Sequence, residues 1–578
     1  MPDSPNGAPQ PTPPKDTKEL SMEIRLLIAF ILMGAVLFLT PYFYKPATPP
    51  PQAPKSVPAA MAPAPGQPAA AAQPAPSVSA EPPPPVGQIA ARKEETFAVD
   101  TQLFRVVFSN RGALVRSWVL KKYRDDAGTQ LDLVNPAGPA RFGFPFALIF
   151  PNQKPAADLD GSLYAAEPAP DGLGVTYRFS DGKVLCEKSF RFRKDSYLVE
   201  ISSEVRQGAV QIPHLLAWRG GFGDPTIENP GNVQRTIYFD LTANKLVTTE
   251  VKAAKDGPLT HGGTFSFAGV EDQYFAALFL AGNGSSIELR TFNDPVVGAV
   301  SKKDEPHIGF AVGGAGLNRY STYVGPKDID TLRRIDPRLE QVVDFGWFWF
   351  LAKPLFASLN WTNDRFVHNY GWSIILVTVV INFLLLPLKL TSLRSAKKMQ
   401  QVQPEIAAIN ARYKGLGLRD PRKAEQNQEV MELYKKHGVN PLGGCMPMVI
   451  QIPFFFAFYK VLSVVIEMRG AHWLWVTDLS RPETLPIRVL PITMMATQFV
   501  LQKMTPTPST DPTQARVMLL MPLMFGFMFY GVQSGLVLYW LTGNVVGIAQ
   551  QWWFNRAAAR SAPPAAPKPT PKKKGSRS

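Results

Sequence analysis

The stretch "WSIILVTVVINFLLLPLKL", residues 372–390, is apolar over almost its whole length and has a single amide, Asn382, near its middle. A helix needs about 20 such residues to cross the hydrocarbon of a bilayer. Further apolar blocks, two of which reach that length only with flanking residues, occur at 26–43, 445–466, 487–501, 517–532 and 535–554. The sequence of 578 residues therefore predicts a mainly α-helical membrane protein with six transmembrane helices and one large insert.

The first apolar block has two interpretations. A cleaved signal peptide would need small residues just after the apolar run, and the nearest such site, Ala60-Met61-Ala62, lies too far downstream. We therefore favour an uncleaved transmembrane anchor over 26–44, preceded by a cytoplasmic N-terminus of residues 1–25. The other five spans are predicted at 371–390, 441–467, 486–503, 516–532 and 534–555.

Basic segments orient the predicted spans. The segment from Lys389 to Lys436 has eleven Lys/Arg against five Asp/Glu, and the tail after Phe554 has seven Lys/Arg and no acid. Loops rich in Lys and Arg stay on the cytoplasmic side. We therefore expect both termini in the cytoplasm and residues 45–361 on the outer side.

The outer region divides in two where the composition changes. Residues 45–92 are rich in Pro and Ala, which favours an extended tether without a core. Within 93–340, short β-type runs alternate with turn residues such as Asp181-Gly182, which predicts a β-sandwich. Cys186 lies in this domain and Cys445 in an apolar block, so we expect no disulfide between them.

The aromatic stretch at 343–361 is too short and too interrupted to cross a bilayer. Trp347, Trp349 and Trp361 are residues of the type that gathers at the headgroup layer. We predict an amphipathic helix lying on the outer membrane face, with these tryptophans as interfacial anchors. A helix buried beneath the sandwich is the alternative.

The segment 391–438 is predicted to form a cytoplasmic helical hairpin. Met399, Val402 and Ile406 follow a helical spacing, and glycines near position 416 separate them from a second helical run. The hairpin and the basic tail, 556–578, are expected to favour encounter with ribosomal RNA and with anionic lipids. The alternative is that their charge serves only to orient the chain.

Enzyme signatures are absent from the sequence. It contains no Walker loop, no His-Glu-x-x-His motif and no Gly-x-Ser-x-Gly motif, and its six histidines lack metal-ligand spacing. We therefore expect no enzymatic activity, no cofactor, no metal and no small-molecule substrate.

Uncharged polar and flexible side chains recur within the predicted spans. Each amide has a plain interpretation, a hydrogen bond between helices of about 0.6 kcal/mol, and methionines pack in any core. Together, in spans that have few charges, they also fit a wet groove that touches varied apolar clients. The candidate groove and client-contact residues are Thr378, Asn382, Lys389, Gln451, Gln498, Met518, Met521, Met524, Met528, Tyr539, Trp540 and Asn544.

Four motifs carry a resemblance to a known family. The motif "NPLGGCMPMVIQIPFFFAFYKVL" (440–462) resembles the third-helix signature of the YidC membrane protein insertases, of the YidC/Oxa/Alb group. The stretches 343–356, 502–522 and 534–551 resemble the same family, and the outer domain fits its Gram-negative form. The resemblance is dense from about 340 to 556.

The resemblance implies a function and a place in the cell. Such proteins insert and fold nascent inner-membrane proteins, alone or with the Sec translocon, without hydrolysing a nucleotide. A core of five helices encloses a hydrophilic groove that is open to the cytoplasm and to lipid. By this resemblance residues 45–361 are periplasmic and the protein is a multi-pass protein of the bacterial inner membrane.

Two positions depart from the family pattern, and two other functions stay open. Asn382 occupies the position where well-studied members have an Arg in the groove, and Gln533 stands where a Pro is frequent. The first departure puts electrostatic attraction of clients by that position in doubt. A transporter or channel, or a sugar-binding or enzymatic sandwich, remains the alternative.

Overall fold

The structure is a computed structural model. It describes residues 87–125, 128–227, 230–281, 286–298, 301–413, 420–440, 446–505, 523, 526–527 and 529–560. The predicted N-terminus and anchor, most of the tether, most of the span at 516–532 and the tail beyond residue 560 lie outside the described residues.

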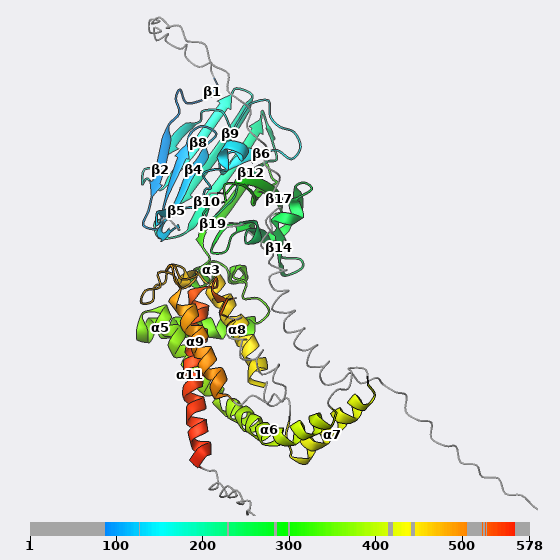
Figure 1. The fold of residues 1–578 in the computed structure, drawn as a ribbon. Helices are drawn as coiled ribbons and strands as arrows, with labels where there is room; N and C mark the ends of the chain where they lie inside the picture. The colour runs from blue at the N-terminus through cyan, green and yellow to red at the C-terminus, as the bar shows by residue number, and fades with distance from the viewer. Residues whose placement is uncertain are drawn as a thin grey trace, which may run out of the picture.

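Strands dominate the first half of the described chain (Figure 1). Their bounds are β1 Gln88–Ile89, β2 Thr96–Asp100, β3 Phe104–Ser109, β4 Leu114–Arg124, β5 Gln130–Asp132, β6 Ala147–Ile149, β7 Ala165–Pro168, β8 Gly174–Asp181, β9 Val184–Phe192, β10 Leu198–Gln207, β11 Val210–Gln211, β12 Leu215–Trp218, β13 Arg235–Asp240, β14 Lys245–Glu250, β15 Leu259–Glu271, β16 Phe275–Leu280, β17 Ser286–Val297, β18 Asp304–Gly313 and β19 Leu317–Pro326.

These strands form two antiparallel sheets among the described residues. One has the order β2-β3-β4-β5. The larger one follows β1-β8-β9-β10-β19-β16-β15-β17-β18-β12-β6, with β7, β11, β13 and β14 at its margins. The long strand β15 pairs with β17 through residues 259–264 and with β16 through residues 267–271, so it passes from one part of the large sheet to another.

Aromatic side chains fill the space between the sheets. Phe108 on β3 lies 4.9 Å, centroid to centroid, from Phe190 on β9, and Trp118 on β4 lies 5.8 Å from Phe192. All four are nearly or fully buried. Burial of such large apolar surface is the main favourable term in folding. The predicted β-rich outer domain is confirmed, and no disulfide supports it, since Cys186 is a free buried thiol.

Two details refine the predicted boundaries of this domain. Asp181-Gly182 closes the β8–β9 hairpin as predicted, and Gly182 has a φ of 87°, which a residue without a Cβ adopts easily. Gln88 and Ile89 lie within the predicted tether but pair with Asp181 and Ser180 of β8. Backbone pairing, which composition does not reveal, therefore extends the sheet into the predicted tether.

Helices make up the second half of the chain, apart from a short α2 in the outer domain. Their bounds are α2 Pro139–Phe142, α3 Ile329–Ile335, α4 Trp349–Thr362, α5 Tyr370–Leu384, α6 Leu386–Arg412, α7 Arg422–Lys436, α8 Met446–Val464, α9 Val489–Met504 and α11 Ser534–Arg560. Short 3-10 turns lie at Pro230–Asn232, Val251–Ala254, Pro337–Val342 and Ile466–Met468, and a π-turn at Asn363–Val367.

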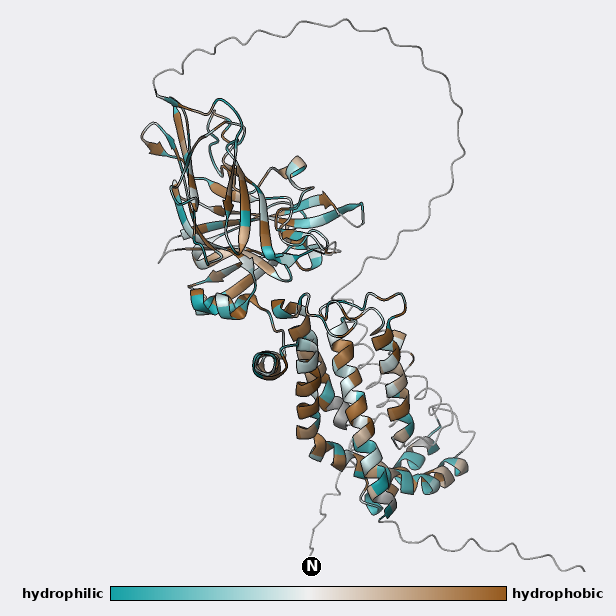
Figure 2. Cartoon of the chain, turned by 90° about the vertical axis from the view of Figure 1, so that its left-hand side faces the viewer, coloured by the Kyte–Doolittle hydropathy of each residue, from teal (hydrophilic) through white to brown (hydrophobic). Residues whose placement is uncertain are grey.

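The helices α5, α8, α9 and α11 lie together beneath the sandwich, and Figure 2 shows that apolar residues predominate along them. Among the described residues no single helix is both long and apolar enough to cross a membrane. One pair of consecutive helical segments, Trp349–Val367 and Tyr370–Leu384, is long and apolar enough when taken together, and the two segments are bent by 115° relative to each other. The predicted span at 371–390 is divided at Leu385, because Pro387 follows and cannot donate a helical hydrogen bond.

The helices α6 and α7 form a hairpin that extends away from the sandwich (Figure 1). Met399, Val402 and Ile406 are buried against the partly buried Leu433 and Tyr434 of α7. Arg412 on α6 also pairs with Glu429 on α7 at 2.7 Å. The first helix begins at Leu386, five residues before the predicted start of the hairpin, since α6 carries on from the end of α5 without a loop.

Candidate functional site

The helix α11 takes part in polar contacts with three other helices of the helical part. It packs along α5 and α9 and also touches α8. Each of these three helices places a predicted polar residue against it. Most of the predicted site residues are therefore brought together by one helix rather than by one cavity.

The side-chain amide of Asn382 has a hydrogen-bond partner for its nitrogen and another for its oxygen. It is 6 % exposed, and its Nδ2 donates to the carbonyl oxygen of Thr378, 2.8 Å away. Its Oδ1 accepts a hydrogen bond of 2.5 Å from the Nζ of Lys389. Thr378 is also buried and donates to the carbonyl of Ile374. The three predicted residues on this face are thus one connected cluster.

Gln550 on α11 completes the cluster and was missed by sequence analysis. Its Oε1 lies 3.5 Å from the Nζ of Lys389, and its Nε2 donates to the carbonyl oxygen of Asn382 at 3.3 Å. The cluster therefore joins α5, α6 and α11 around one ammonium group. A signal existed, since Gln550 and Gln551 interrupt the apolar run of the last predicted span.

Gln451 on α8 and Tyr539 on α11 meet directly. The amide of Gln451 donates to the hydroxyl of Tyr539, which is 2 % exposed. The ring of Tyr539 also stacks on Phe458 with a centroid separation of 4.0 Å. This pair holds α8 against α11, which is the plain role weighed for Gln451.

Gln498, Trp540 and Asn544 join α9 to α11. The indole Nε1 of Trp540 donates to the Oε1 of Gln498 at 3.2 Å. Asn544 is buried, and its Nδ2 lies 3.3 Å from the carbonyl of Met494 and from the hydroxyl of Thr497. These amides are therefore satisfied by neighbouring helices. Gln533, the second departure from the family pattern, similarly contacts the hydroxyl of Ser463 on α8.

The remaining predicted residues separate into two groups. Met518, Met521, Met524 and Met528 lie outside the described residues. The predicted anchors Trp347, Trp349 and Trp361 are 91 %, 57 % and 59 % exposed. On the opposite side of α4, Leu355, Phe356 and Leu359 are buried. The helix therefore has one covered face and one face of exposed indoles.

The outer loop between α8 and α9 contains a second feature that the sequence did not reveal. Arg469, in this loop, forms an ion pair of 2.5 Å with Asp224 of the sandwich. Gln273, also from the sandwich, donates to the carbonyl of Ser463 at the end of α8. No spacing rule connects residues this far apart in sequence, so only the fold could bring them together.

Known proteins resemble the chain over nearly its whole length. Residues 96–358 match the profile of the YidC periplasmic domain, and residues 361–561 match that of the 60Kd inner membrane protein. The membrane protein insertase YidC of Citrifermentans bemidjiense is 36% identical over 93% of this chain and 100% of its own length.

The chain belongs to the YidC family of membrane protein insertases.

One further relative agrees with this membership. The YidC of Geobacter sp. strain M21 is 36% identical over 79% of this chain and 85% of its own length. The chain is also similar to a crystal structure of an active YidC insertase with its first transmembrane domain resolved. The match covers 81% of this chain and 94% of the insertase chain, at 17% identity and a TM-score of 0.34. The two profiles meet between residues 358 and 361, inside α4.

Proposed function

We propose that this protein inserts nascent proteins into the bacterial inner membrane. The observation that carries the proposal is the 36% identity to an insertase over 93% of the chain's length. These relatives give no support to the transporter or channel considered from the sequence. The proposed architecture is an N-terminal anchor at 26–44, a periplasmic sandwich and a core of five further membrane helices.

The proposed site of client entry is the cluster around Lys389. The ammonium group is held by two amide oxygens, those of Asn382 and Gln550, on two different helices. In this chain the cation is thus supplied by Lys389 beside the position where the family pattern has an Arg. An acidic or polar client tail that entered from the cytoplasm would find a charged partner there, so electrostatic attraction remains available although Asn382 is neutral.

The energetics favour such a site. Carrying a polar group through hydrocarbon without a partner costs several kcal/mol, and a hydrated or charged site part-way across lowers that cost. The client's own apolar helix then contributes roughly 0.3–0.6 kcal/mol for each Leu, Ile, Phe or Val. The insertase needs to lower a barrier and not to supply energy. We accordingly propose no enzymatic step and no cofactor.

Other roles follow from the same proposal. Among the remaining candidates, Gln451, Gln498, Tyr539, Trp540 and Asn544 would shape the groove wall through their contacts between helices. The methionines at 518, 521, 524 and 528 would touch the apolar segment of the client. The hairpin α6–α7 and the basic tail would meet the ribosome and anionic lipids, and the Sec translocon would act beside the protein for some clients.

Complementation of a depletion strain tests the proposal. The variant Lys389→Met removes the ammonium, and Lys398→Met removes an exposed charge from the same helix as a matched control. We expect Lys389→Met to slow insertion of a client with an acidic translocated tail about tenfold, because losing one charge-assisted hydrogen bond changes a free energy by an amount that corresponds to about that factor. Insertion of a neutral-tailed client should be unchanged. Normal insertion of both clients by Lys389→Met would contradict the role of this ammonium. Normal insertion in cells depleted of the protein would contradict the function itself.

A further inference from the structure

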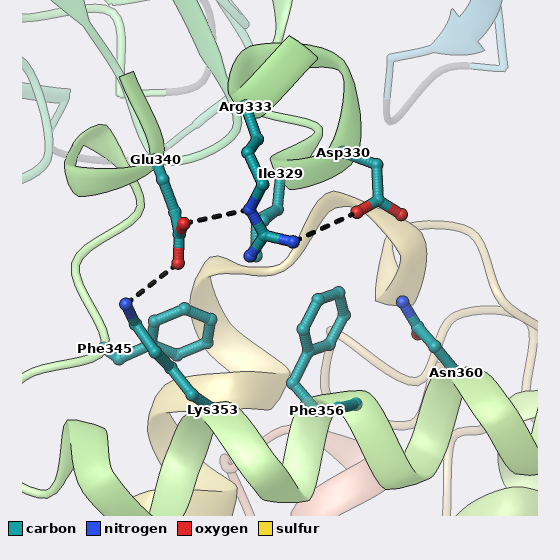
Figure 3. A pocket seen from close by; sticks show the side chains of 9 residues that line it. Ile329, Asp330, Arg333, Glu340, Phe345, Lys353, Phe356 and Asn360 are labelled. Carbon is teal, nitrogen blue, oxygen red and sulfur yellow. Dashed lines mark hydrogen bonds and ion pairs between the residues drawn. The ribbon is translucent and has the colours of Figure 1, made fainter. Parts of the chain in front are cut away.

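A pocket of about 230 Å³ lies where the sandwich meets α4 (Figure 3). Its upper wall comes from α3 and the 3-10 turn Pro337–Val342, and its floor comes from α4. The lining residues are Ile329, Asp330, Arg333, Glu340, Phe345, Lys353, Phe356, Ala357 and Asn360. The end of the sandwich and the first long helix of the helical part thus enclose one space.

The pocket has two cations and two carboxylates, and one carboxylate is closely hydrogen-bonded while the other is only loosely paired. Glu340 accepts from Arg333 Nε at 3.0 Å and from Lys353 Nζ at 2.8 Å, and these bonds hold its pKa below the usual value. Asp330 lies 3.9 Å from Arg333 Nη1 and is 68 % exposed, so it is only loosely paired. Arg333 has five N–H donors in total and Lys353 has three, so both cations keep donors for a further partner.

The rest of the lining is apolar apart from one amide. Phe345 and Phe356 face the space, and the amide nitrogen of Asn360 turns toward it (Figure 3), while its oxygen accepts from the hydroxyl of Tyr370. Ala357 lies one helical turn before the exposed Trp361 on α4. A molecule seated in the pocket would therefore extend its apolar part along an exposed indole.

We propose that this pocket binds the headgroup of a zwitterionic aminophospholipid of the outer leaflet, such as phosphatidylethanolamine. The phosphate would accept hydrogen bonds from Arg333, Lys353 and the amide of Asn360. The primary ammonium would donate to Asp330, which lacks a close partner. The acyl chains would run along Ala357 and Trp361. This inference rests on the proposed position of α4 at the outer membrane face.

The pairing of both charge signs distinguishes this lipid from the alternatives. An anionic headgroup without an amine would pair with the two cations, but its negative charge would lie close to the carboxylate of Asp330 and be repelled by it. A quaternary ammonium could not donate a hydrogen bond to Asp330. A large net positive charge is the usual feature of a site for anionic lipid, and here two carboxylates balance two cations.

Native mass spectrometry of the full-length protein tests the proposal. The protein is reconstituted in nanodiscs that contain equal parts of phosphatidylethanolamine and phosphatidylglycerol, then released, and the retained lipid is counted. The variants are Arg333→Gln and Ala357→Leu, which remove a donor and fill the pocket. The matched controls are Arg334→Gln and Ser358→Leu, which change the neighbouring exposed residues outside the lining.

We expect phosphatidylethanolamine to be retained in preference to phosphatidylglycerol by the wild type and both controls, and about tenfold less by Arg333→Gln. Equal retention of the two lipids, or equal loss in the controls, would overturn the inference. Binding of free phosphoethanolamine without retention of the lipid would also overturn it, since the source would then be soluble. Client insertion by the wild type is scored separately, so a failure of the proposed function would appear there and not in the lipid count.

Discussion

The guanidinium of Arg469 donates a hydrogen bond of 2.5 Å to the carboxylate of Asp224, and so joins the loop after α8 to the sandwich. The two side chains are 6 % and 0 % exposed. The same guanidinium also donates to the carbonyl of Arg124 and lies 5.2 Å from the centroid of the Tyr274 ring. Such a buried pair fixes the position of the sandwich on the helices.

Loss of one partner should loosen this junction. The variant Arg469→Gln removes the close cation of the buried Asp224 and leaves only Arg481, whose Nη2 lies 3.9 Å from the same carboxylate. Loss of one partner of a buried ion pair costs roughly 3 kcal/mol. We expect faster hydrogen exchange in residues 219–227, measured on the full-length protein. Arg488→Gln is the control, because this half-buried arginine of the same outer loop donates to the carbonyl of Tyr530 and belongs to another contact, so that exchange should be unchanged. Equal protection in both variants would show that the pair does not hold the sandwich.

Deletion of most of the sandwich should be partly tolerated. Removal of residues 100–320 leaves α4 and the helices of the core, so some client insertion should remain in a depletion strain. It also exposes Arg469, which loses Asp224, and protein levels should therefore fall. Deletion of 343–361 should abolish insertion, because α4 packs on α5 and α8 through its buried face. Complete loss of activity in the first variant at normal protein levels would refute this prediction.

The effect of a substitution at Asn382 on client insertion should depend on the side chain at position 389. In Asn382→Leu the ammonium loses its shortest acceptor, so we expect lower thermal stability and slower insertion of acidic-tailed clients. In Asn382→Arg two cations would lie close together, at a cost of roughly 4 kcal/mol for a separation of about 4 Å near a protein surface. The pair Asn382→Arg with Lys389→Gln should recover activity. Full activity of Asn382→Arg alone would contradict the coupling.

The sandwich should lose stability in mild acid through His214. This buried ring has its Nδ1 2.9 Å from the carbonyl of Ile212 and its Nε2 2.8 Å from the hydroxyl of Ser203, and burial lowers its pKa from 6.5 to about 4. A histidine whose folded pKa is depressed contributes stability above pH 6.5, and this contribution is lost as the pH falls toward 4. At pH 5.5 the loss should be roughly 1 kcal/mol.

Hydrogen-exchange protection of β10 and β12 at pH 7.5 and 5.5, corrected for the intrinsic exchange rate, measures this loss. His214→Gln removes the titrating group and serves as the comparison. Protection that falls equally with pH in both proteins would assign the effect to other groups, such as His307, whose pKa burial also lowers to about 4.

The basic tail should contribute to ribosome recruitment through long-range attraction. Deletion of 561–578 removes five Lys/Arg and no acid. We expect weaker co-sedimentation with ribosomes at low salt and a smaller difference at high salt, where charges are screened. Unchanged binding at low salt would leave the tail with a topological role only.

Local patterns were sufficient for several elements. The β-rich outer domain, the Asp181-Gly182 hairpin and the spacing of Met399, Val402 and Ile406 all depend on neighbours in sequence, and the structure contains each of them. Family membership was also predictable, because the motif at 440–462 and its companions are continuous stretches. Helix ends were less predictable, since Pro387 breaks a run that remains apolar on both sides.

Contacts between distant residues were decided by the tertiary structure alone. The sequence determined that amides occur in the apolar spans, and the fold determined that Asn382 meets Lys389 and Gln550 while Gln451 meets Tyr539. The physical reason is that a buried polar group must find a partner within about 3 Å, and that partner is chosen by how helices pack and not by spacing along the chain. Composition and periodicity therefore identified which side chains needed partners, and only packing supplied the partners.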